Sequence, residues 1–132
     1  MACILLLDDK DADRHALRAL LETDGHLVSE ASDGEAGVDL YRKDRHDLVL
    51  LDLTLPRKGG SAPLLNLVSE FPDVKILVTA RGAETIGTRK YLEIADRAGT
   101  VRSLAKPFTP EHLRRAVRVM LEGGEWVRVK SS

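Results

Sequence analysis

Short runs rich in aliphatic residues recur along this chain, and most of them end in a polar residue. Runs of this kind, about five residues long, predict strands of a sheet, and the continuous ones predict strands that are buried on both faces. Five strands are expected in all. They cover residues 3–7, 26–30, 47–51, 74–78 and 100–104.

Between these runs, apolar residues recur every three or four positions, which predicts amphipathic helices. The expected helices cover residues 12–21, 35–43, 62–70, 89–97 and 110–122. Their ends carry familiar signals: Asp24-Gly25 stops the first helix, Ser32 or Asp33 caps the second, and Thr109-Pro110 begins the last. Five uninterrupted strand–helix units predict an α/β fold with a doubly wound, five-stranded parallel sheet and helices on both faces.

Composition limits the class of protein. With 132 residues, the chain has the length of one domain, for which we expect residues 1–122, followed by a short tail at 123–132. The net charge is only −1, so we expect no broad nucleic-acid surface and no anionic-membrane surface.

The beginning of the chain bears on location. Its first apolar stretch has only six residues, too few for a signal-peptide core or a membrane span, and this favours a cytoplasmic protein. Cys3 is the only cysteine, so no internal disulfide can form. Because Cys3 lies within an apolar run, we expect it to be a buried, reduced thiol.

Polar residues stand where four of the predicted strands end: Asp8 and Asp9, Asp52, Thr79, and Lys106. The carboxyl ends of parallel strands open onto one crevice, where ligands of such sheets bind. Three carboxylates, one hydroxyl and one ammonium group are therefore expected to converge at one edge of the sheet.

These residue types suit magnesium and phosphate. Mg²⁺ prefers oxygen ligands and takes one or two carboxylates directly, which Asp8, Asp9 and Asp52 can supply. A carboxylate can also attack phosphorus, and Asp52, standing alone after the central run, is the candidate nucleophile. Lys106 and Thr79 would hold phosphoryl oxygens by charge and by a hydrogen bond.

Simpler interpretations exist for each feature alone. Paired aspartates after a strand are more often a helix cap, and Asp11 is a further cap candidate. The four histidines do not share metal-ligand spacing, so we expect them to be packing or surface residues. A basic stripe on the last helix favours a solvated face, with an acidic partner or a homodimer contact as the alternative. That stripe comprises Arg114, Arg115 and Arg118.

Taken together and in order, these motifs resemble the response-regulator receiver domain of two-component signalling, over about residues 3–121. The matching elements are Leu7-Asp8-Asp9, Asp52 to Pro56 with Gly59-Gly60, Val78-Thr79-Ala80, and Lys106-Pro107-Phe108.

The resemblance implies the CheY-like fold, a flavodoxin-like arrangement with strand order 2-1-3-4-5. It implies that Asp52 is the phosphoacceptor, that Asp8, Asp9, Asp52 and the backbone carbonyl of Thr54 bind Mg²⁺, and that Thr79 and Lys106 hold the phosphoryl group. It further implies a cis peptide at Lys106-Pro107, and phosphate received from a histidine kinase or a histidine phosphotransfer protein.

The chain departs from the family pattern in two places. Ser103 stands where the family usually carries an aromatic switch residue, and the segment from Thr79 to Lys106 is longer than usual, with the surplus in Arg81 to Thr88. We therefore expect the signal to leave through that extended segment, whose Gly82 and Gly87 give backbone freedom.

The function we predict is a stand-alone receiver that is not an enzyme in the usual sense. It would catalyse only its own phosphorylation and dephosphorylation, and would signal by binding an unknown downstream protein or by shuttling phosphate. Two alternatives remain open: a phosphorylation-independent adaptor on the same fold, and a magnesium-dependent phosphohydrolase of the haloacid-dehalogenase type. The second would need an acid–base aspartate where Thr54 stands.

Overall fold

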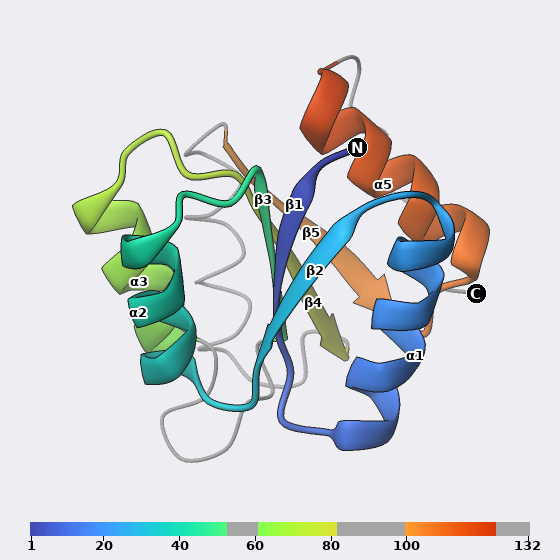
Figure 1. The fold of residues 1–132 in the computed structure, drawn as a ribbon, viewed down its shortest axis with the longest axis horizontal. Coiled ribbons are helices and arrows are strands. Elements are labelled where there is room, and N and C mark those ends of the chain that lie inside the picture. The colour runs from blue at the N-terminus through green and yellow to red at the C-terminus, as the bar shows by residue number, and fades with distance from the viewer. Residues whose placement is uncertain (53–60, 82–99, 124–132) are drawn as a thin grey trace.

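The computed structural model describes residues 1–52, 61–81 and 100–123, and Figure 1 shows their arrangement. Five strands are present: β1 (Cys3–Leu7), β2 (Leu27–Ala31), β3 (Leu48–Asp52), β4 (Ile76–Arg81) and β5 (Val101–Lys106). The described helices are α1 (Asp11–Thr23), α2 (Gly34–Lys43), α3 (Ser61–Glu70) and α5 (Pro110–Glu122). The helix expected at 89–97 lies outside the described residues.

The strands form one parallel sheet in the order β2-β1-β3-β4-β5, so the predicted fold class and strand order are confirmed. Helices α1 and α5 cover one face of the sheet, while α2 and α3 cover the other (Figure 1). The central strands are thus enclosed between two layers of helices, which explains why they read as continuous apolar runs.

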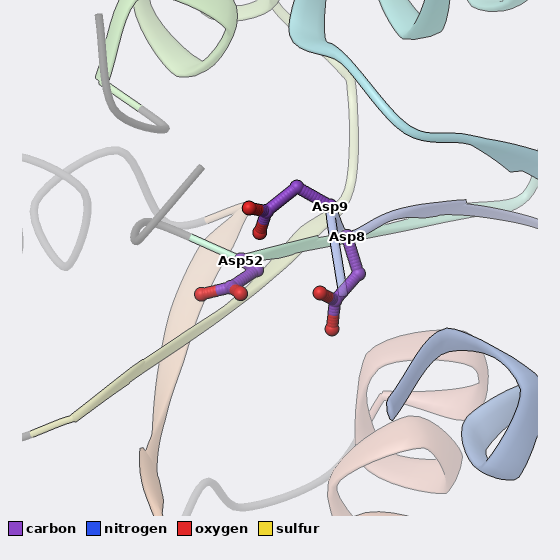
Figure 2. Close-up of side chains that lie close together, drawn as sticks. All are labelled: Asp8, Asp9 and Asp52. Carbon is purple, nitrogen blue, oxygen red and sulfur yellow. The ribbon is translucent and has the colours of Figure 1, made fainter. Parts of the chain in front are cut away.

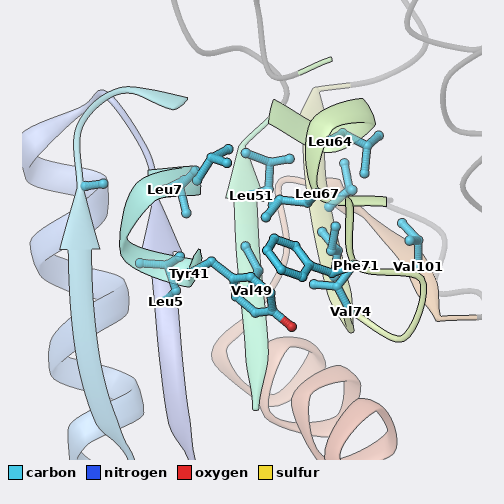
Figure 3. Packing of buried hydrophobic residues seen from close by; sticks show 14 residues of the cluster. Leu5, Leu7, Tyr41, Val49, Leu51, Leu64, Leu67, Phe71, Val74 and Val101 are labelled. Carbon is cyan, nitrogen blue, oxygen red and sulfur yellow. The ribbon is translucent and has the colours of Figure 1, made fainter. Parts of the chain in front are cut away.

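Alternate residues of each central strand enter different cores. Leu5 and Leu7 of β1 face α2 and α3, whereas Ile4 and Leu6 face α1 and α5. Figure 3 shows the first core, in which the leucines of β1 lie beside Val49 and Leu51 of β3 and the aromatic rings of Tyr41 and Phe71. Burial of these side chains fixes the register of the strands, because a shift by one residue would exchange the two faces.

The helix ends follow the signals in the sequence. The Asp33 carboxylate accepts a hydrogen bond from Ala36 N at 2.8 Å, and the Thr109 hydroxyl oxygen accepts one from His112 N at 3.1 Å. Gly25 follows α1 with a φ of +90°, a conformation that side chains other than glycine rarely adopt. Two capping predictions and one stop signal are therefore confirmed.

The expectation that Cys3 is buried is wrong. Cys3 is exposed, and full burial along β1 begins only at Ile4. Its backbone N–H donates to the Asp47 carboxylate at 2.8 Å, at the edge of the sheet where the strand starts. The apolar run therefore begins one residue before the helices cover the sheet.

Helix α2 lies very close to β1 at Gly37. A Cβ atom placed on Gly37 would lie 2.5 Å from Cγ of Leu7, a side chain that is fully buried. Since Leu7 is packed in the first core and directly precedes Asp8, it cannot move aside without disturbing the core and the strand end.

We predict that Gly37→Val lowers the free energy of unfolding by about 1–3 kcal/mol, because overpacking forces the helix away from β1. Ala36→Val is the matched control: Ala36 is the preceding residue of α2 and is exposed, so it carries the cost of a β-branched helical residue alone. Urea denaturation of both variants measures the difference. Equal losses of stability in the two variants would contradict the close-packing account.

Candidate functional site

The strand order brings the predicted site residues to one edge of the sheet. Leu7 pairs with Leu51, so Asp8 and Asp52 follow neighbouring positions on adjacent strands. Asp52 pairs in turn with Thr79 on β4. β5 continues the same edge on the far side of β4 and ends at Lys106. Residues from four distant parts of the sequence, Asp8 and Asp9, Asp52, Thr79 and Lys106, are thus carried to the carboxyl ends of four adjacent strands.

Three carboxylates gather at this edge. One oxygen atom each of Asp8, Asp9 and Asp52 lies within 4.8 Å of the others. Figure 2 shows Asp8 and Asp9 on consecutive positions after β1, with Asp52 beside them at the end of β3. Asp8 and Asp52 are nearly inaccessible to solvent, with exposed fractions of 1% and 2%. Buried, adjacent carboxylates repel one another and require a positive partner.

Two oxygen atoms of this cluster are buried and have no hydrogen-bond partner among the described residues: Oδ2 of Asp8 and Oδ1 of Asp9. Buried polar atoms are normally satisfied, and an exception points to a missing ligand or to function. Carboxylate oxygens are the donors that Mg²⁺ prefers. The donor set and its unsatisfied atoms therefore fit a divalent cation of this kind.

The environment of Asp8 disfavours its ionised form. Burial raises the pKa of the Asp8 carboxyl above its ordinary value, and the nearby Asp52 carboxylate raises it further. The hydrogen bond that Lys10 N donates to Asp8 Oδ1, at 2.9 Å, and the charge of Lys106 act in the opposite direction but do not cancel the rise in pKa. A cation bound here would favour the ionised form of the Asp8 carboxyl.

Lys106 places a positive charge beside Asp52. Its Nζ lies 3.4 Å from Oδ2 of Asp52, and its side chain is 12% exposed. The peptide between Lys106 and Pro107 is cis, as expected. The predicted proximity of the lysine and the central aspartate is therefore confirmed.

Thr79 is buried at the end of β4, with 2% of its surface exposed. Its register partner is Asp52, and this places it at the same edge of the sheet. Ser103, the residue at the usual aromatic position, is partly buried on β5 and pairs with Val78. Thr54, Gly59-Gly60 and the segment from 82 to 88 lie outside the described residues.

The helix-cap interpretation of the aspartates is wrong. The residue at the N-cap of α1 is Lys10, and no side chain caps that helix end. The Asp8 carboxylate instead accepts from Lys10 N, within the turn itself. Asp9 and Asp11 do not cap α1 either, so neither member of the acid pair is needed to begin the helix.

Arg14 and Glu30 belong to none of the sequence motifs, yet both bear on this turn. Arg14, one helical turn into α1, donates to the backbone carbonyl oxygen of Asp8 and to the Glu30 carboxylate. The sequence signal was weak: Asp11 and Arg14 have the spacing of a helical ion pair, which is common on solvated helices. The contact of Arg14 with Glu30 on β2 joins residues far apart in the sequence, so the spacing of charges along the chain does not predict it.

Comparison with known families identifies this arrangement. The family model described as "Response regulator receiver domain" matches residues 4–118. Among curated proteins, Protein CcdB of Bacillus subtilis is 35% identical over 91% of this chain and 98% of its own length. The transcriptional regulatory protein CpxR of Escherichia coli is 37% identical over 93% of this chain, and DegU of Brevibacillus brevis is 28% identical over 96% of it.

The chain spans about half the length of CpxR and DegU, 50% and 53% respectively. Solved structures agree with the fold. A two-component response regulator of the LuxR family from Aurantimonas sp. superposes with a TM-score of 0.80 at 30% identity, covering 93% of this chain and 86% of that one. A receiver domain from Clostridium thermocellum has a TM-score of 0.82 at 23% identity, covering 92% of this chain and 95% of its own.

Proposed function

This chain belongs to the response regulator receiver domain family of two-component signalling, and on that basis we propose that Asp52 accepts a phosphoryl group in a magnesium-dependent reaction. The phosphoryl donor is a histidine kinase or a histidine phosphotransfer protein. Receiver domains are signalling proteins rather than enzymes with a turnover substrate, and we propose that this chain acts by phosphorylation-dependent binding of a partner protein or by passing the phosphoryl group on.

One observation supports this proposal most strongly. The carboxylate cluster of Asp8, Asp9 and Asp52 and the ammonium group of Lys106 lie together at the edge of the sheet, and one oxygen each of Asp8 and Asp9 lacks a hydrogen-bond partner in the described part of the chain. A cluster that served stability alone would have its buried oxygens satisfied, because each unsatisfied group costs about 1–3 kcal/mol. The arrangement suits a protein that gains its missing ligands during function.

Each residue of the site would have its own role in phosphoryl transfer. An oxygen of Asp52 attacks phosphorus and forms the aspartyl phosphate, while the bond from phosphorus to the donor's imidazole nitrogen breaks. Lys106 balances the negative charge of Asp52 beforehand and that of the phosphoryl oxygens afterwards. Thr79, beside Asp52 in the register, would donate its hydroxyl hydrogen to a phosphoryl oxygen.

Asp8, Asp9 and Asp52, with the backbone carbonyl of Thr54, would hold Mg²⁺. The ion, when bound, supplies positive charge that offsets the charge of the phosphoryl oxygens during transfer. Among the described residues, Oδ2 of Asp8 and Oδ1 of Asp9 have no hydrogen-bond partner, which would leave these two oxygens available to a cation.

Partners follow from the family and remain proposals. CpxR and DegU are named transcriptional regulatory proteins and are about twice as long as this chain, so our expectation of no nucleic-acid partner stays a prediction. The structure contains no helix long and apolar enough to cross a membrane in the three ranges that it describes. The domain limits, residues 1–122 with a tail at 123–132, and the cytoplasmic location are likewise proposed.

The two alternative functions are less well supported. A phosphohydrolase of the haloacid-dehalogenase type would need a second aspartate in place of Thr54, and it has no use for an acid pair after the first strand. A phosphorylation-independent adaptor would need neither the buried acid cluster nor the ion pair of Lys106 with Asp52. Retention of both is costly without phosphorylation.

Incubation with acetyl phosphate and Mg²⁺ tests the proposed function. We expect the intact mass to rise by one phosphoryl group, in a form stable to acid and labile to base. Omission of Mg²⁺ should prevent the rise. An unchanged mass with acetyl phosphate and with phosphorylated donor proteins would favour the adaptor, whereas steady turnover of a generic phosphomonoester would favour the phosphohydrolase.

Lys106→Ala is expected to separate phosphorylation from response. Asp52 and the acid pair remain in this variant, so some phosphorylation should persist, but the link between β5 and the phosphoryl group is lost. We predict a much smaller spectral change on beryllofluoride binding than in the wild type. Lys75→Ala, at an exposed lysine preceding β4, is the control and should respond normally. A spectral change in Lys106→Ala equal to that of the wild type would show that Lys106 is not required for the response.

A further inference from the structure

Arg14 of α1 reaches back to the backbone of the turn that carries the acid pair. Its Nη1 donates to the carbonyl oxygen of Asp8 at 2.8 Å, its Nε to Oε1 of Glu30 at 3.1 Å, and its Nη2 to Oδ1 of Asp11 at 2.7 Å. All three guanidinium nitrogens are therefore engaged, and the side chain is only 12% exposed. A long side chain that is fixed at three points holds its partners in a defined position.

The carbonyl that Arg14 binds belongs to the peptide joining Asp8 to Asp9. A peptide unit is planar, so its orientation sets how the Cα–Cβ bond of Asp9 lies relative to that of Asp8. Among the described residues, the one further backbone hydrogen bond of Asp8 to the sheet runs from Asp8 N to Ala31 O at 3.3 Å. The strong hold on this peptide thus comes from Arg14.

Arg14 is itself anchored to the neighbouring strand. Glu30 lies on β2 beside Leu6 of β1, and its other carboxylate oxygen accepts from Arg18 Nη1 at 2.5 Å. The carboxylates of Glu30 and Asp11 offset the charge of the Arg14 guanidinium. Arg14 therefore contributes mainly through geometry at the turn rather than as a free positive charge.

We propose that Arg14 is a positioning residue for the metal site: by holding the peptide between Asp8 and Asp9, it directs both carboxylates toward Asp52. This inference rests on the proposed function, since it concerns the same cation. Partners that orient metal ligands typically contribute about 10- to 100-fold to metal affinity. A lysine at this position keeps the positive charge but lacks the planar guanidinium group, whose nitrogens here bond three acceptors.

Two variants and a matched control test the proposal. Arg14→Gln and Arg14→Lys remove the guanidinium group of Arg14. The control, Arg18→Gln, removes a neighbouring arginine that bonds Glu30 and Glu22 but makes no hydrogen bond to the turn. The Mg²⁺ dissociation constant is measured by calorimetry. Exchange of the Asp9 and Lys10 amides is measured by NMR in metal-free protein.

We expect Mg²⁺ affinity to fall about 10-fold in both Arg14 variants and to change less than about 2-fold in Arg18→Gln. Protection of the Lys10 amide, which donates to Asp8, should be lost in the Arg14 variants only. Equal effects of Arg14→Gln and Arg18→Gln would overturn the proposal, and so would wild-type affinity in Arg14→Lys, because charge alone would then suffice. If Arg14→Gln does not fold, Arg14→Lys decides.

Failure of the proposed function has a different signature. A wild-type protein that neither binds Mg²⁺ nor gains a phosphoryl group would refute the metal site itself. The amide-exchange measurement would still test whether Arg14 holds the turn, because it is made on metal-free protein. Wild-type binding and phosphorylation with unchanged Arg14 variants would refute the positioning role alone.

Discussion

Asp52→Asn is expected to abolish phosphorylation of this chain by acetyl phosphate or by a phosphorylated donor protein. The amide that replaces the carboxylate has no charged oxygen to attack phosphorus, so the reaction loses its nucleophile. Asp52 is the only aspartate at the end of a central strand that also forms an ion pair with Lys106, at 3.4 Å, among the described residues. No other carboxylate there has the same neighbours.

The control for this experiment is Asp9→Asn, which keeps the nucleophile and changes one proposed metal ligand. We expect Asp9→Asn to be phosphorylated slowly and to need a higher Mg²⁺ concentration than the wild type. We expect no phosphorylation of Asp52→Asn. Circular dichroism of both variants verifies that the fold is retained. Labelling of Asp52→Asn at the wild-type rate would move the reaction to another residue.

Magnesium is expected to raise the melting temperature of the wild type. A ligand that binds only the folded state adds RT ln(1 + [L]/Kd) to stability, about 1.4 kcal/mol at ten times Kd. For a domain of this size, that corresponds to a rise of several degrees in Tm. The repulsion among Asp8, Asp9 and Asp52 makes the effect specific, because the cation relieves it. Calorimetric scans at increasing Mg²⁺ concentration measure the effect.

The pH dependence of this effect has a definite sign. The pKa of Asp8 is raised in the folded state, so the folded protein binds that proton more tightly than the unfolded chain does. The associated stability is present below the ordinary pKa of 3.8 and is lost as pH rises through the raised pKa. Because Mg²⁺ replaces the proton, its effect on Tm should grow with rising pH over the same range.

Asp9→Asn should remove most of the magnesium response and should stabilise the metal-free protein by relieving repulsion. Asp44→Asn is the control, since Asp44 is an exposed carboxylate after α2 at the opposite end of the sheet. It should retain the wild-type response. Identical melting of the wild type in magnesium and in chelator would refute the metal site.

Most of the site could be predicted because its residues follow directly from strand ends. Once continuous apolar runs indicate parallel strands, the position after each run is placed at one edge of the sheet. This rule alone predicts that Asp8, Asp52 and Lys106 lie close together, and the structure confirms it. The boundaries at β4 and β5 were less accurate: both strands extend to include Thr79 and Lys106 themselves.

Features that depend on tertiary contacts could not be predicted. The exposure of Cys3 depends on where the helices stop covering β1, which periodicity does not reveal. The bond from Arg14 to the Asp8 carbonyl depends on how α1 packs against β2, where Arg14 also bonds Glu30. Likewise, the close approach of Gly37 to Leu7 is set by helix packing rather than by any turn signal. The proposed output segment, Arg81 to Thr88, lies beyond the described residues except for its first.

The central claim is that Asp52 carries the phosphoryl group, and borohydride reduction tests it most directly. Reduction of an aspartyl phosphate converts that aspartate to homoserine, which peptide mass spectrometry locates by residue. After reaction with acetyl phosphate and Mg²⁺, we predict homoserine at position 52 and unchanged aspartate at positions 8 and 9. Homoserine at another position, or a phosphoryl group on a histidine with position 52 unchanged, would contradict the account.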